Sequence, residues 1–460
     1  MAIPFSIQEH GDDDPDDEPV DIGQLSSASP SSTFERLPAE IIQYIASYLS
    51  PSDLACFGVT CRSLADHASN DLLWANFVNE RLPVPIQDPS PFASFRRLYL
   101  AYHPCWFIPQ HKIWFADNEH TGTLIIARYD NRRGVIEAYR VVAERGAPQF
   151  QIWMSNPEVM IQSFDPDVHL WLDDPILFLK DPDPSSRAAP IQYFHSMSDE
   201  RRMPMALEAH HIYNTLSFCS ISSPEEQDIT PDMLWPPRTI PSNARTICAS
   251  TNSTLTAPEE LSDLSELCFR IRKWANFRSM FSPVPNESII TYSTLDPVLY
   301  TPTKEKPYQG IWVGDYSAHG CEFLLILQKD TVPLARDNRT KPGTSAKKEI
   351  EPDFKEEVGQ RGRLEAIKLT GDPNVPRGQF SFIAKDIGSR GLVGIAMDEP
   401  FAGARIVRCR GQVAGIGFHD DTFIDSQLIL ISSDHMAHYW KEMGHVSYYR
   451  RVDIDALLHT

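Results

Sequence analysis

A run of short helical patterns between Leu37 and Trp74 constrains the fold of this 460-residue chain more than any other feature. Pro38 is compatible with a helix start because first-turn N–H groups have no partner inside the helix. Apolar residues then recur at helical spacing, at Ile41, Ile45, Tyr48 and Leu49. The segment therefore predicts a first helix that begins near residue 38.

Three further helix starts follow at short intervals. Ser50-Pro51-Ser52-Asp53 combines a capping residue, a first-turn proline and an acidic residue. A third short helix is expected around Leu64, and a fourth that is capped by Asp71. A unit this short buries too little apolar surface to be stable alone. We therefore expect its apolar surface to be covered by a partner protein. The alternative is that the rest of the chain covers it, as in an ordinary helical bundle at the edge of a larger domain.

This segment, taken as residues 33–80, resembles an F-box. The resemblance is carried by Leu37-Pro38, Glu40, Ile41, Ile45, Leu49, the turn from Ser50 to Leu54, Val59, Cys61-Arg62 and Leu73-Trp74. It implies docking onto the Skp-type adaptor of a cullin-based ubiquitin ligase. The candidate adaptor-binding residues are Leu37, Pro38, Glu40, Ile41, Ile45, Leu49, Leu54 and Trp74.

Charge and apolar content narrow the classes of partner. The net charge of −20 argues against nucleic acid or an anionic membrane as the main partner. Residues 1–32 hold eight acidic residues and neither lysine nor arginine, which is typical of a disordered, solvated tail. No apolar run is long enough to cross a bilayer, and the first residues lack the pattern of a secretory signal. These features predict a cytoplasmic or nuclear protein.

Eight cysteines are scattered along the chain and form no C-x-x-C pair. This spacing gives no support for a zinc site. In an intracellular protein, the cysteines are expected to be reduced and mostly buried thiols. We therefore expect neither a metal nor another cofactor.

The remainder of the chain predicts a β-rich domain. A helical connector is expected over 81–104, with a short helix at Phe92–Tyr102, followed by a substrate domain over 105–460. Short strands separated by Gly, Pro and Asp favour a closed or nearly closed antiparallel barrel. Polar stretches near 220–260 and 329–363 indicate insertions, and Leu261–Phe277 has the pattern of an amphipathic helix. The fold class is thus α+β, a helical F-box followed by an antiparallel β-barrel-like domain.

A second motif alternates glycines with aromatic residues from Gly310 to Glu322. Together with the segments Lys368–Gly378, Gly415–Phe418 and Tyr439–Val452, it resembles the F-box only protein thirty-one subfamily. That resemblance implies a β domain that binds the extended C-terminal end of a target protein. The candidate substrate-binding residues are Trp312, Tyr316, His319, Glu322, Lys368, Thr370, Asp372 and Phe418.

Structural roles for several of these residues stay open. Trp312 and Phe418 are the size of core residues, and Asp372 has the chemistry of a tight turn. Ser317, His319 and Cys321 do not by themselves establish catalysis, because closeness in sequence does not define a reactive geometry. We therefore expect a non-enzymatic substrate receptor. The alternative is a lipocalin-like carrier or sensor of small molecules joined to an F-box, suggested by the Gly310-x-Trp312 pair.

Overall fold

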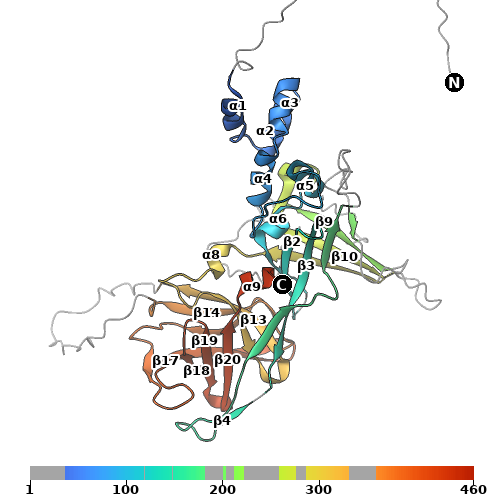
Figure 1. Cartoon of the computed structure of the whole chain (residues 1–460). Helices are drawn as coiled ribbons and strands as arrows, with labels where there is room; N and C mark the ends of the chain where they lie inside the picture. The colour runs from blue at the N-terminus through green and yellow to red at the C-terminus, as the bar shows by residue number, and fades with distance from the viewer. Residues whose placement is uncertain are drawn as a thin grey trace, which may run out of the picture. The chain divides into compact units, whose positions relative to one another are not determined.

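The computed structural model describes residues 37–118, 120–147, 149–181, 200–203, 212–221, 258–275, 286–330 and 359–459. It divides into two compact units, Met1–Leu73 and Trp74–Thr460. The predicted acidic tail at 1–32 lies outside the described residues, as do most of the predicted insertions near 220–260 and 329–363. The prediction of an α+β fold is confirmed by the helices and strands of Figure 1.

Short helices form the first unit. They are α1 (Ala39–Ala46), α2 (Pro51–Gly58) and α3 (Arg62–Ala68), and α4 (Asp71–Asn79) continues into the second unit. The hydroxyl of Ser50 accepts a hydrogen bond from the backbone N–H of Asp53, as the capping pattern predicts. The expected cap at Asp71 is wrong by one residue, because the side chain of Asn70 accepts from the N–H of Leu72 instead.

An antiparallel sheet begins the second unit. Helices α5 (Phe95–Tyr102) and α6 (Phe107–His111) precede it, and among the described residues it has nine strands. Their order is β6-β3-β2-β1-β11-β10-β9-β8, with β7 also paired to β3. The strands are β1 (Ile113–Ala116), β2 (Leu124–Asp130), β3 (Val135–Arg145), β6 (Pro166–Leu170), β7 (Leu177–Lys180), β8 (Arg201–Met203), β9 (Ile212–Ser220), β10 (Leu264–Ala275) and β11 (Asn286–Thr294).

The predicted helix over Leu261–Phe277 is wrong. A single 3-10 turn, η2 (Leu261–Asp263), leads directly into strand β10. β10 pairs with β9 on one side and β11 on the other, so ladder hydrogen bonds on both edges outweigh the helical spacing. The sequence pattern is ambiguous because Phe269 and Ile271 also alternate at strand spacing.

A closed antiparallel barrel of eight strands follows, as predicted. Its strands are β12 (Gly310–Asp315), β13 (Cys321–Lys329), β14 (Arg363–Lys368), β15 (Phe380–Ala384), β17 (Arg405–Gly415), β18 (His419–Leu430), β19 (His435–Trp440) and β20 (His445–Arg451). The barrel closes where β15 pairs with β17 at Phe382↔Gly411 and Ile383↔Arg410. Strand β16 (Leu392–Ile395) extends the edge of β17.

Side chains on the two faces of the barrel strands β13 and β14 enter two different cores. Leu324, Leu364 and Phe382 point inward and fill the barrel. Residues of the opposite parity, such as Leu325 and Ile367, pack against the nine-stranded sheet and helix α9 (Ile454–Leu458). This alternation follows the two-residue period of a strand. Both faces of these strands are therefore covered.

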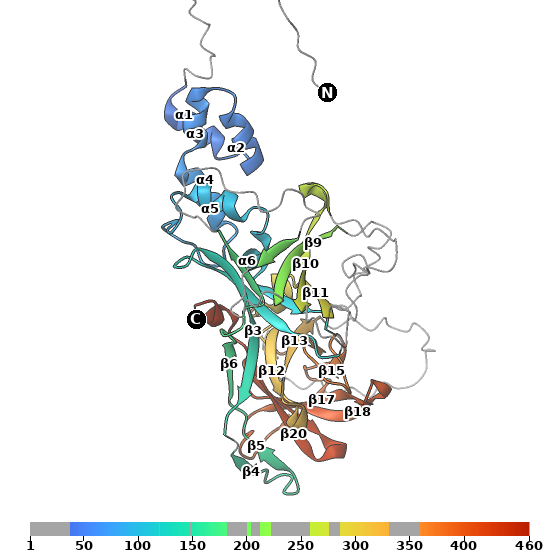
Figure 2. The ribbon, with the colours of Figure 1, turned by 90° about the vertical axis from the view of Figure 1, so that its right-hand side faces the viewer.

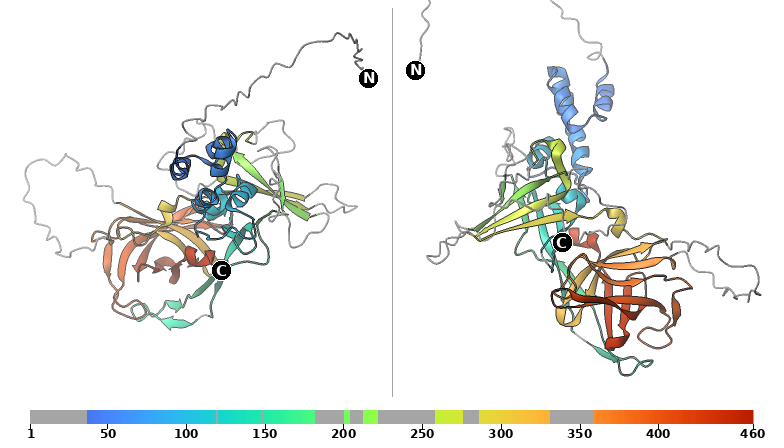
Figure 3. Two further views of the ribbon diagram at one scale, coloured as in Figure 1. Left: turned by 45° about the horizontal axis from the view of Figure 1, so that its top comes forward. Right: turned by 180° about the vertical axis from the view of Figure 1, so that it is seen from behind.

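Two smaller features complete the second unit. The hairpin of β4 (Phe150–Ile152) and β5 (Met160–Gln162) is reached from the long strand β3, and β5 contacts β20 (Figure 2). Helix α8 (Pro297–Tyr300) precedes the barrel strands. The two further views in Figure 3 show the strands of the barrel wrapping around its interior.

Candidate functional site

A pocket of about 260 Å³ lies at one end of the barrel. Four segments far apart in the sequence form its wall: the β12–β13 connection with η3 (Ser317–His319), the β14–β15 loop, the end of β17, and the β19–β20 connection with η4 (Lys441–Met443). The lining residues are Tyr316, Ser317, His319, Lys368, Asp372, Asn374, Val375, Ser381, Gln412, Val413, Ala414, Trp440, Met443, His445 and Ser447.

A buried lysine and two carboxyl groups form the charged part of this site. Nζ of Lys368 lies 2.7 Å from Oε2 of Glu322 and 2.7 Å from Oδ2 of Asp372, and the Lys368 side chain is only 2% exposed. The same ammonium lies 4.4 Å from the centre of the Tyr316 ring, within range of a cation–π interaction. Lys368 is thus held on three sides and cannot swing out to meet a ligand.

The two carboxyl groups differ in protonation. Burial raises the pKa of Glu322 to about 8, and its hydrogen bond with Asp372 adds to the rise, although the charge of Lys368 opposes it. Burial also acts to raise the pKa of Asp372, but the hydrogen bond from Glu322 and the charge of Lys368 outweigh it and hold that pKa below its usual value. The raised pKa favours the protonated form of Glu322, and the lowered pKa favours the ionised form of Asp372.

Backbone contacts fix the carboxylate of Asp372 in place. Its Oδ1 accepts hydrogen bonds from the N–H groups of Asn374 (2.7 Å) and Val375 (2.9 Å), while Oδ2 faces Lys368. The β14–β15 loop is joined to the end of β17, because Asn374 donates to the carbonyl of Ala414. Asp372 therefore builds a tight turn and also carries charge at the pocket.

Aromatic side chains form another part of the wall. The indole N–H of Trp440 donates to Oγ of Ser447 at 3.1 Å. The ring of His438 lies behind Trp440 with its centroid 4.2 Å away, and burial lowers the pKa of His438 to about 3. The hydroxyl groups of Tyr316 and Ser381 are hydrogen-bonded to each other. The wall is rigid because each of these polar groups has a partner within the barrel.

The eight candidate substrate-binding residues fall into three groups. Tyr316, His319, Lys368 and Asp372 line the pocket, and Glu322 contacts Lys368 from the buried side. The other three lie elsewhere. Trp312 lies in the barrel core, and Phe418 lies in the β17–β18 turn. The hydroxyl of Thr370 accepts a hydrogen bond from the backbone N–H of Phe323.

Sequence reasoning missed several lining residues. Ser381 and Gln412 come from strands with no distinctive motif, and Met443 and Ser447 lie in the segment Tyr439–Val452 but were not named as candidates. Only the closing of the barrel brings these four residues together. Trp440 belongs to a segment that the sequence singled out, but its place at the pocket could not be read from spacing. Gln412 is only 6% exposed, which is unusual for a polar side chain, but this burial is visible only in the structure.

The helical unit presents a second candidate site on α1. Ile42 and Ala46 are buried, whereas Ile41, Tyr44 and Tyr48 are 45%, 62% and 72% exposed. Leu37, four residues before Ile41, is also exposed. Their spacing of three or four residues places these side chains on one helical stripe, which we call the α1 face. A contiguous exposed apolar stripe of this kind is typical of a surface that binds a partner.

Not all candidate adaptor-binding residues lie on the α1 face. Leu37, Pro38, Glu40 and Ile41 are exposed, and Ile45 and Leu49 are half-buried. Leu54 is fully buried, and Trp74 is buried against Phe77 and Tyr99. Leu54 and Trp74 therefore support the helices from within. Tyr44 was missed, although its place between Ile41 and Tyr48 at helical spacing is a signal the sequence does contain.

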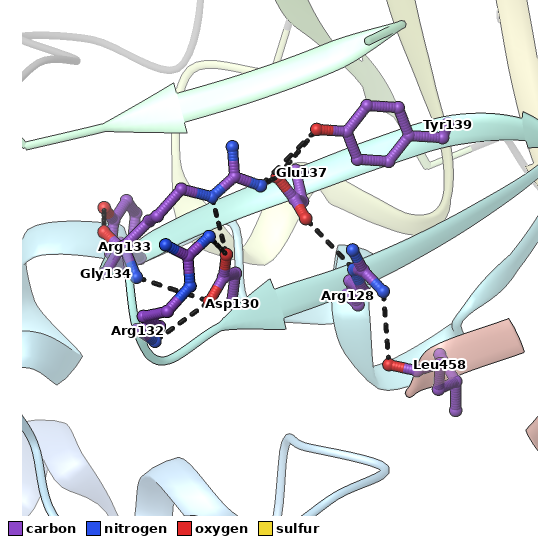
Figure 4. A network of polar contacts seen from close by, with 9 residues as sticks. Arg128, Asp130, Arg132, Arg133, Gly134, Glu137, Tyr139 and Leu458 are labelled. Carbon is purple, nitrogen blue, oxygen red and sulfur yellow. Dashed lines mark hydrogen bonds and ion pairs between the residues drawn. The ribbon is translucent and has the colours of Figure 1, made fainter. Parts of the chain in front are cut away.

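A further polar network occupies the hairpin between β2 and β3 (Figure 4). Nε of Arg128 lies 3.0 Å from Oε1 of the fully buried Glu137, and Arg133 also contacts Glu137. Arg133 and Arg132 also contact Asp130, and a second nitrogen of Arg128 donates to the carbonyl of Leu458 in α9. Each carboxylate is thus engaged by arginine, so we assign this network to joining the hairpin and α9.

The described residues contain no helix that is both long and apolar enough to span a membrane. Within the same residues, His, Cys, Asp and Glu side chains form no group of three that could hold a metal ion.

Comparison with known families identifies both regions. Residues 34–80 match the family described as F-box-like, and residues 292–456 match the family described as Cyclin D1 binding domain. The chain therefore carries an F-box-like domain, which supports docking to a Skp-type adaptor in general. The second match covers the barrel and its pocket.

Individual proteins show similarity over a shorter stretch. Protein EXECUTER 2, chloroplastic, of Arabidopsis thaliana is 28% identical over 151 residues, or 33% of this chain. Protein EXECUTER 1, chloroplastic, of the same plant is 26% identical over 163 residues. In both cases the match spans 21% of the relative's own length, about a fifth.

Proposed function

We propose that this protein is the substrate-recognition subunit of an SCF-type ubiquitin ligase. It docks a Skp-type adaptor, and through it a cullin, with its F-box-like domain and captures a target protein with the barrel. The observation that carries the proposal is the exposed α1 face within residues that match the F-box-like family. The chain contributes binding and positioning, and ubiquitin transfer belongs to other subunits.

Docking through α1 is supported by the cost of leaving its apolar side chains in water. Burying a large apolar side chain contributes about 1.5–3 kcal/mol, so covering Ile41, Tyr44 and Tyr48 is a sufficient source of affinity. Tyr44 and Tyr48 are already ordered, with ring centroids 5.1 Å apart and their hydroxyls 2.6 Å apart. A partner therefore meets a preorganised surface and loses little side-chain entropy.

The barrel pocket suits the end of a polypeptide better than its middle. The pocket is open at the barrel end, whereas buried apolar side chains such as Leu324 and Phe382 fill the interior. A chain that enters a blind pocket has to stop there, so a C-terminal residue is the fitting ligand. Trp440, Tyr316 and Met443 supply apolar contacts, and Asp372, Ser381 and Gln412 supply polar ones.

Charge restricts how that terminus is held. Lys368 is buried and balanced by Asp372, so the pocket does not offer a free cation to a carboxylate. Oε1 of Gln412 is buried and accepts no hydrogen bond from another described residue, so it can accept one from the ligand. We infer that hydrogen bonding and shape contribute more to the affinity for the terminus than net charge does. Peptides with a free C-terminus and with a modified one therefore both have to be tested.

The matched families bear on the nature of the target. The description of the second family names cyclin D1 as what that domain binds, which supports a protein target for this barrel as well. We also propose membership of the F-box only protein thirty-one subfamily, on the barrel motifs, and action in the cytoplasm or nucleus. Binding of a small molecule in a lipocalin-like cavity is less favoured, because the pocket has a charged floor and the interior below is filled.

The docking step is tested by co-purification with a Skp-type adaptor. The double variant L37A/P38A changes the start of the α1 face and should lose the adaptor while the barrel keeps its melting temperature. Adaptor recovery equal to that of the unmodified chain would contradict docking through this helix.

The capture step is tested with a library of peptides that differ in the C-terminal residue and in its free or amidated form. M443D places a charge at the pocket on a residue that is 54% exposed, so the fold should tolerate it. M397D is the matched control, since Met397 is 83% exposed and does not line the pocket. Peptide binding should be lost in M443D and kept in M397D. Equal binding by both variants would exclude this pocket.

A further inference from the structure

Two buried cysteines face each other across neighbouring strands of the nine-stranded sheet. Cys219 follows Phe218 on β9, and Cys268 precedes Phe269 on β10, where Phe218 and Phe269 are directly paired. The two thiols hydrogen-bond to each other and form a small buried cluster of their own. The two cysteines are not themselves a ladder pair, because the register shifts between Leu264 and Phe269, but each adjoins one member of the pair Phe218↔Phe269. Their side chains form one buried cluster, which is the proximity that a disulfide requires.

The cysteine pair lies at a break in the strand ladder. The register of β9 and β10 shifts between Leu264 and Phe269, which marks a bulge. Within that bulge, Sγ of Cys268 lies 3.5 Å from Oγ of the half-buried Ser265, and the neighbouring Leu267 is 57% exposed. Cys268 itself keeps 9% exposure. A bulge lacks ladder hydrogen bonds, so this side of the pair opens to a molecule the size of water at low cost.

A neighbouring guanidinium favours the thiolate of Cys219. Nε of Arg270 lies 3.3 Å from Sγ of Cys219. The hydrogen bond from Cys268 lowers the pKa of Cys219, and the charge of Arg270 lowers it further, although burial and Asp117 oppose both. The same hydrogen bond and burial raise the pKa of Cys268. One thiol is thus prepared as the nucleophile and the other as its resolving partner.

Two other buried thiols among the described residues, Cys105 and Cys409, differ from this pair. Burial raises the pKa of Cys105 to about 11, although Arg201 opposes the rise, and raises that of Cys409 to about 12. A thiol that stays protonated reacts slowly with peroxide, because the thiolate is the reactive form. Cys105 and Cys409 therefore serve as internal controls for burial without activation.

We propose that Cys219 and Cys268 are a peroxide-sensitive dithiol that forms a reversible disulfide. The Cys219 thiolate attacks one oxygen of hydrogen peroxide, forming a sulfenic acid, and the departing hydroxide takes a proton to become water. The Cys268 sulfur then attacks the Cys219 sulfur, its proton leaves with the hydroxyl group, and a second water forms. The two thiols lose two electrons in total, and one peroxide is reduced to two waters.

The bond would fasten β9 to β10 at the bulge. These strands are joined in sequence by a long connection, so a covalent bond between them restricts the unfolded chain and raises the melting temperature. Reduction by dithiothreitol would reverse the change. The site is separate from the barrel pocket and from the α1 face, and its failure would leave the proposed function untouched.

The first test uses the unmodified full-length chain, so it does not depend on a variant that folds. The reduced protein is treated with graded hydrogen peroxide, blocked with N-ethylmaleimide and digested for peptide mapping by mass spectrometry. The Cys219–Cys268 linked peptide should reach half conversion at a peroxide dose at least tenfold below that which modifies Cys105 or Cys409. Oxidation of those controls at the same dose, or oxidation of Cys219 without linkage, would overturn the proposal.

A second test separates the two roles. In C268S the sulfenic acid on Cys219 has no resolving thiol and should be trapped by dimedone, whereas C219S should give no dimedone adduct on Cys268. C409S is the matched control, and it should form the linked peptide at the dose that the unmodified chain requires. Dimedone labelling on Cys268 in C219S, with none on Cys219 in C268S, would reverse the assignment of nucleophile and contradict the role of Arg270.

Discussion

The α1 face and the barrel treat apolar side chains in opposite ways. In the barrel strands β13 and β14, alternate residues enter one of two cores, so both faces of these strands are covered by the same chain. In α1, Ile42 and Ala46 are covered while Ile41, Tyr44 and Tyr48 are left in water. The comparison teaches that apolar content alone does not reveal a binding surface. What matters is whether the chain itself completes the packing.

Polar groups are also treated differently in the two regions, being buried in the barrel and exposed in the helical unit. The barrel buries Lys368, Glu322 and Asp372 at its pocket, where desolvation is large and geometry has to be fixed. The helical unit keeps its polar groups at the surface and uses them for capping, as Ser50 does for α2. Binding specificity in the barrel is therefore expected to depend on rigid polar geometry, and binding by α1 on apolar area.

Substitution of a barrel core residue should have the largest effect on stability. Trp312 is fully buried, donates to the carbonyl of Tyr308 at 3.0 Å and lies under Arg451, whose guanidinium is 5.2 Å from its ring. W312A should lower the free energy of unfolding by about 3–5 kcal/mol, as large-to-small core changes do. Thermal or denaturant unfolding measures the loss. A stable W312A that loses only peptide binding would place Trp312 at the pocket instead of in the core.

A charge on the α1 face should weaken binding and leave stability nearly unchanged, which is the opposite of the result expected for W312A. I41D should weaken adaptor binding by on the order of 100-fold, about 2.7 kcal/mol, because an aspartate would have to be buried at the interface. The free energy of unfolding should change by no more than about 0.5 kcal/mol, because the Ile41 side chain is 45% exposed in the free protein. Isothermal titration with the adaptor measures the first quantity and thermal unfolding the second.

The matched control for that substitution is V298D. Val298 is 74% exposed and lies in α8, outside the F-box-like domain. It should bind the adaptor as the unmodified chain does. Equal weakening by I41D and V298D would mean that added negative charge, and not the α1 face, determines the affinity.

The pH dependence of barrel stability tests the buried carboxyl group. Glu322 has a pKa of about 8 when folded and an ordinary value of 4.5, so between these values the folded state holds a proton that the unfolded state has released. The contribution of Glu322 to stability is therefore full below about pH 4.5 and is lost as pH rises toward 8. Asp372 has the opposite sign, and its contribution is lost only in acid, outside this window.

E322Q should remove that fall, because glutamine has no proton to lose. The melting temperatures of the unmodified chain and of E322Q, measured from pH 5 to pH 8, should converge at the acid end and separate at the alkaline end, with E322Q higher. Parallel curves for the two proteins would contradict a protonated Glu322 beside Lys368.

These tests also separate what the sequence could predict from what it could not. Local signals predicted the helix starts and a barrel of short strands, because capping at Ser50 and the Gly, Pro and Asp breaks between strands act over a few residues. The helix predicted near Leu267 failed because β9 and β11, its neighbours on either side, are distant in sequence. The pocket depends on four separate segments, so motifs could indicate Lys368 and Asp372 but not Ser381 or Gln412.

The smallest expected effect concerns His319. It lines the pocket from the β12–β13 connection and is exposed, so H319A should leave the melting temperature unchanged. Loss of one hydrogen-bonding side chain at the rim should weaken a C-terminal peptide by about 1 kcal/mol, or about fivefold. H435A is the matched control, because His435 is exposed at the start of β19 and does not line this pocket. If H319A and H435A bind peptide equally, the rim at the β12–β13 connection does not contact the ligand, and recognition is confined to the rigid interior.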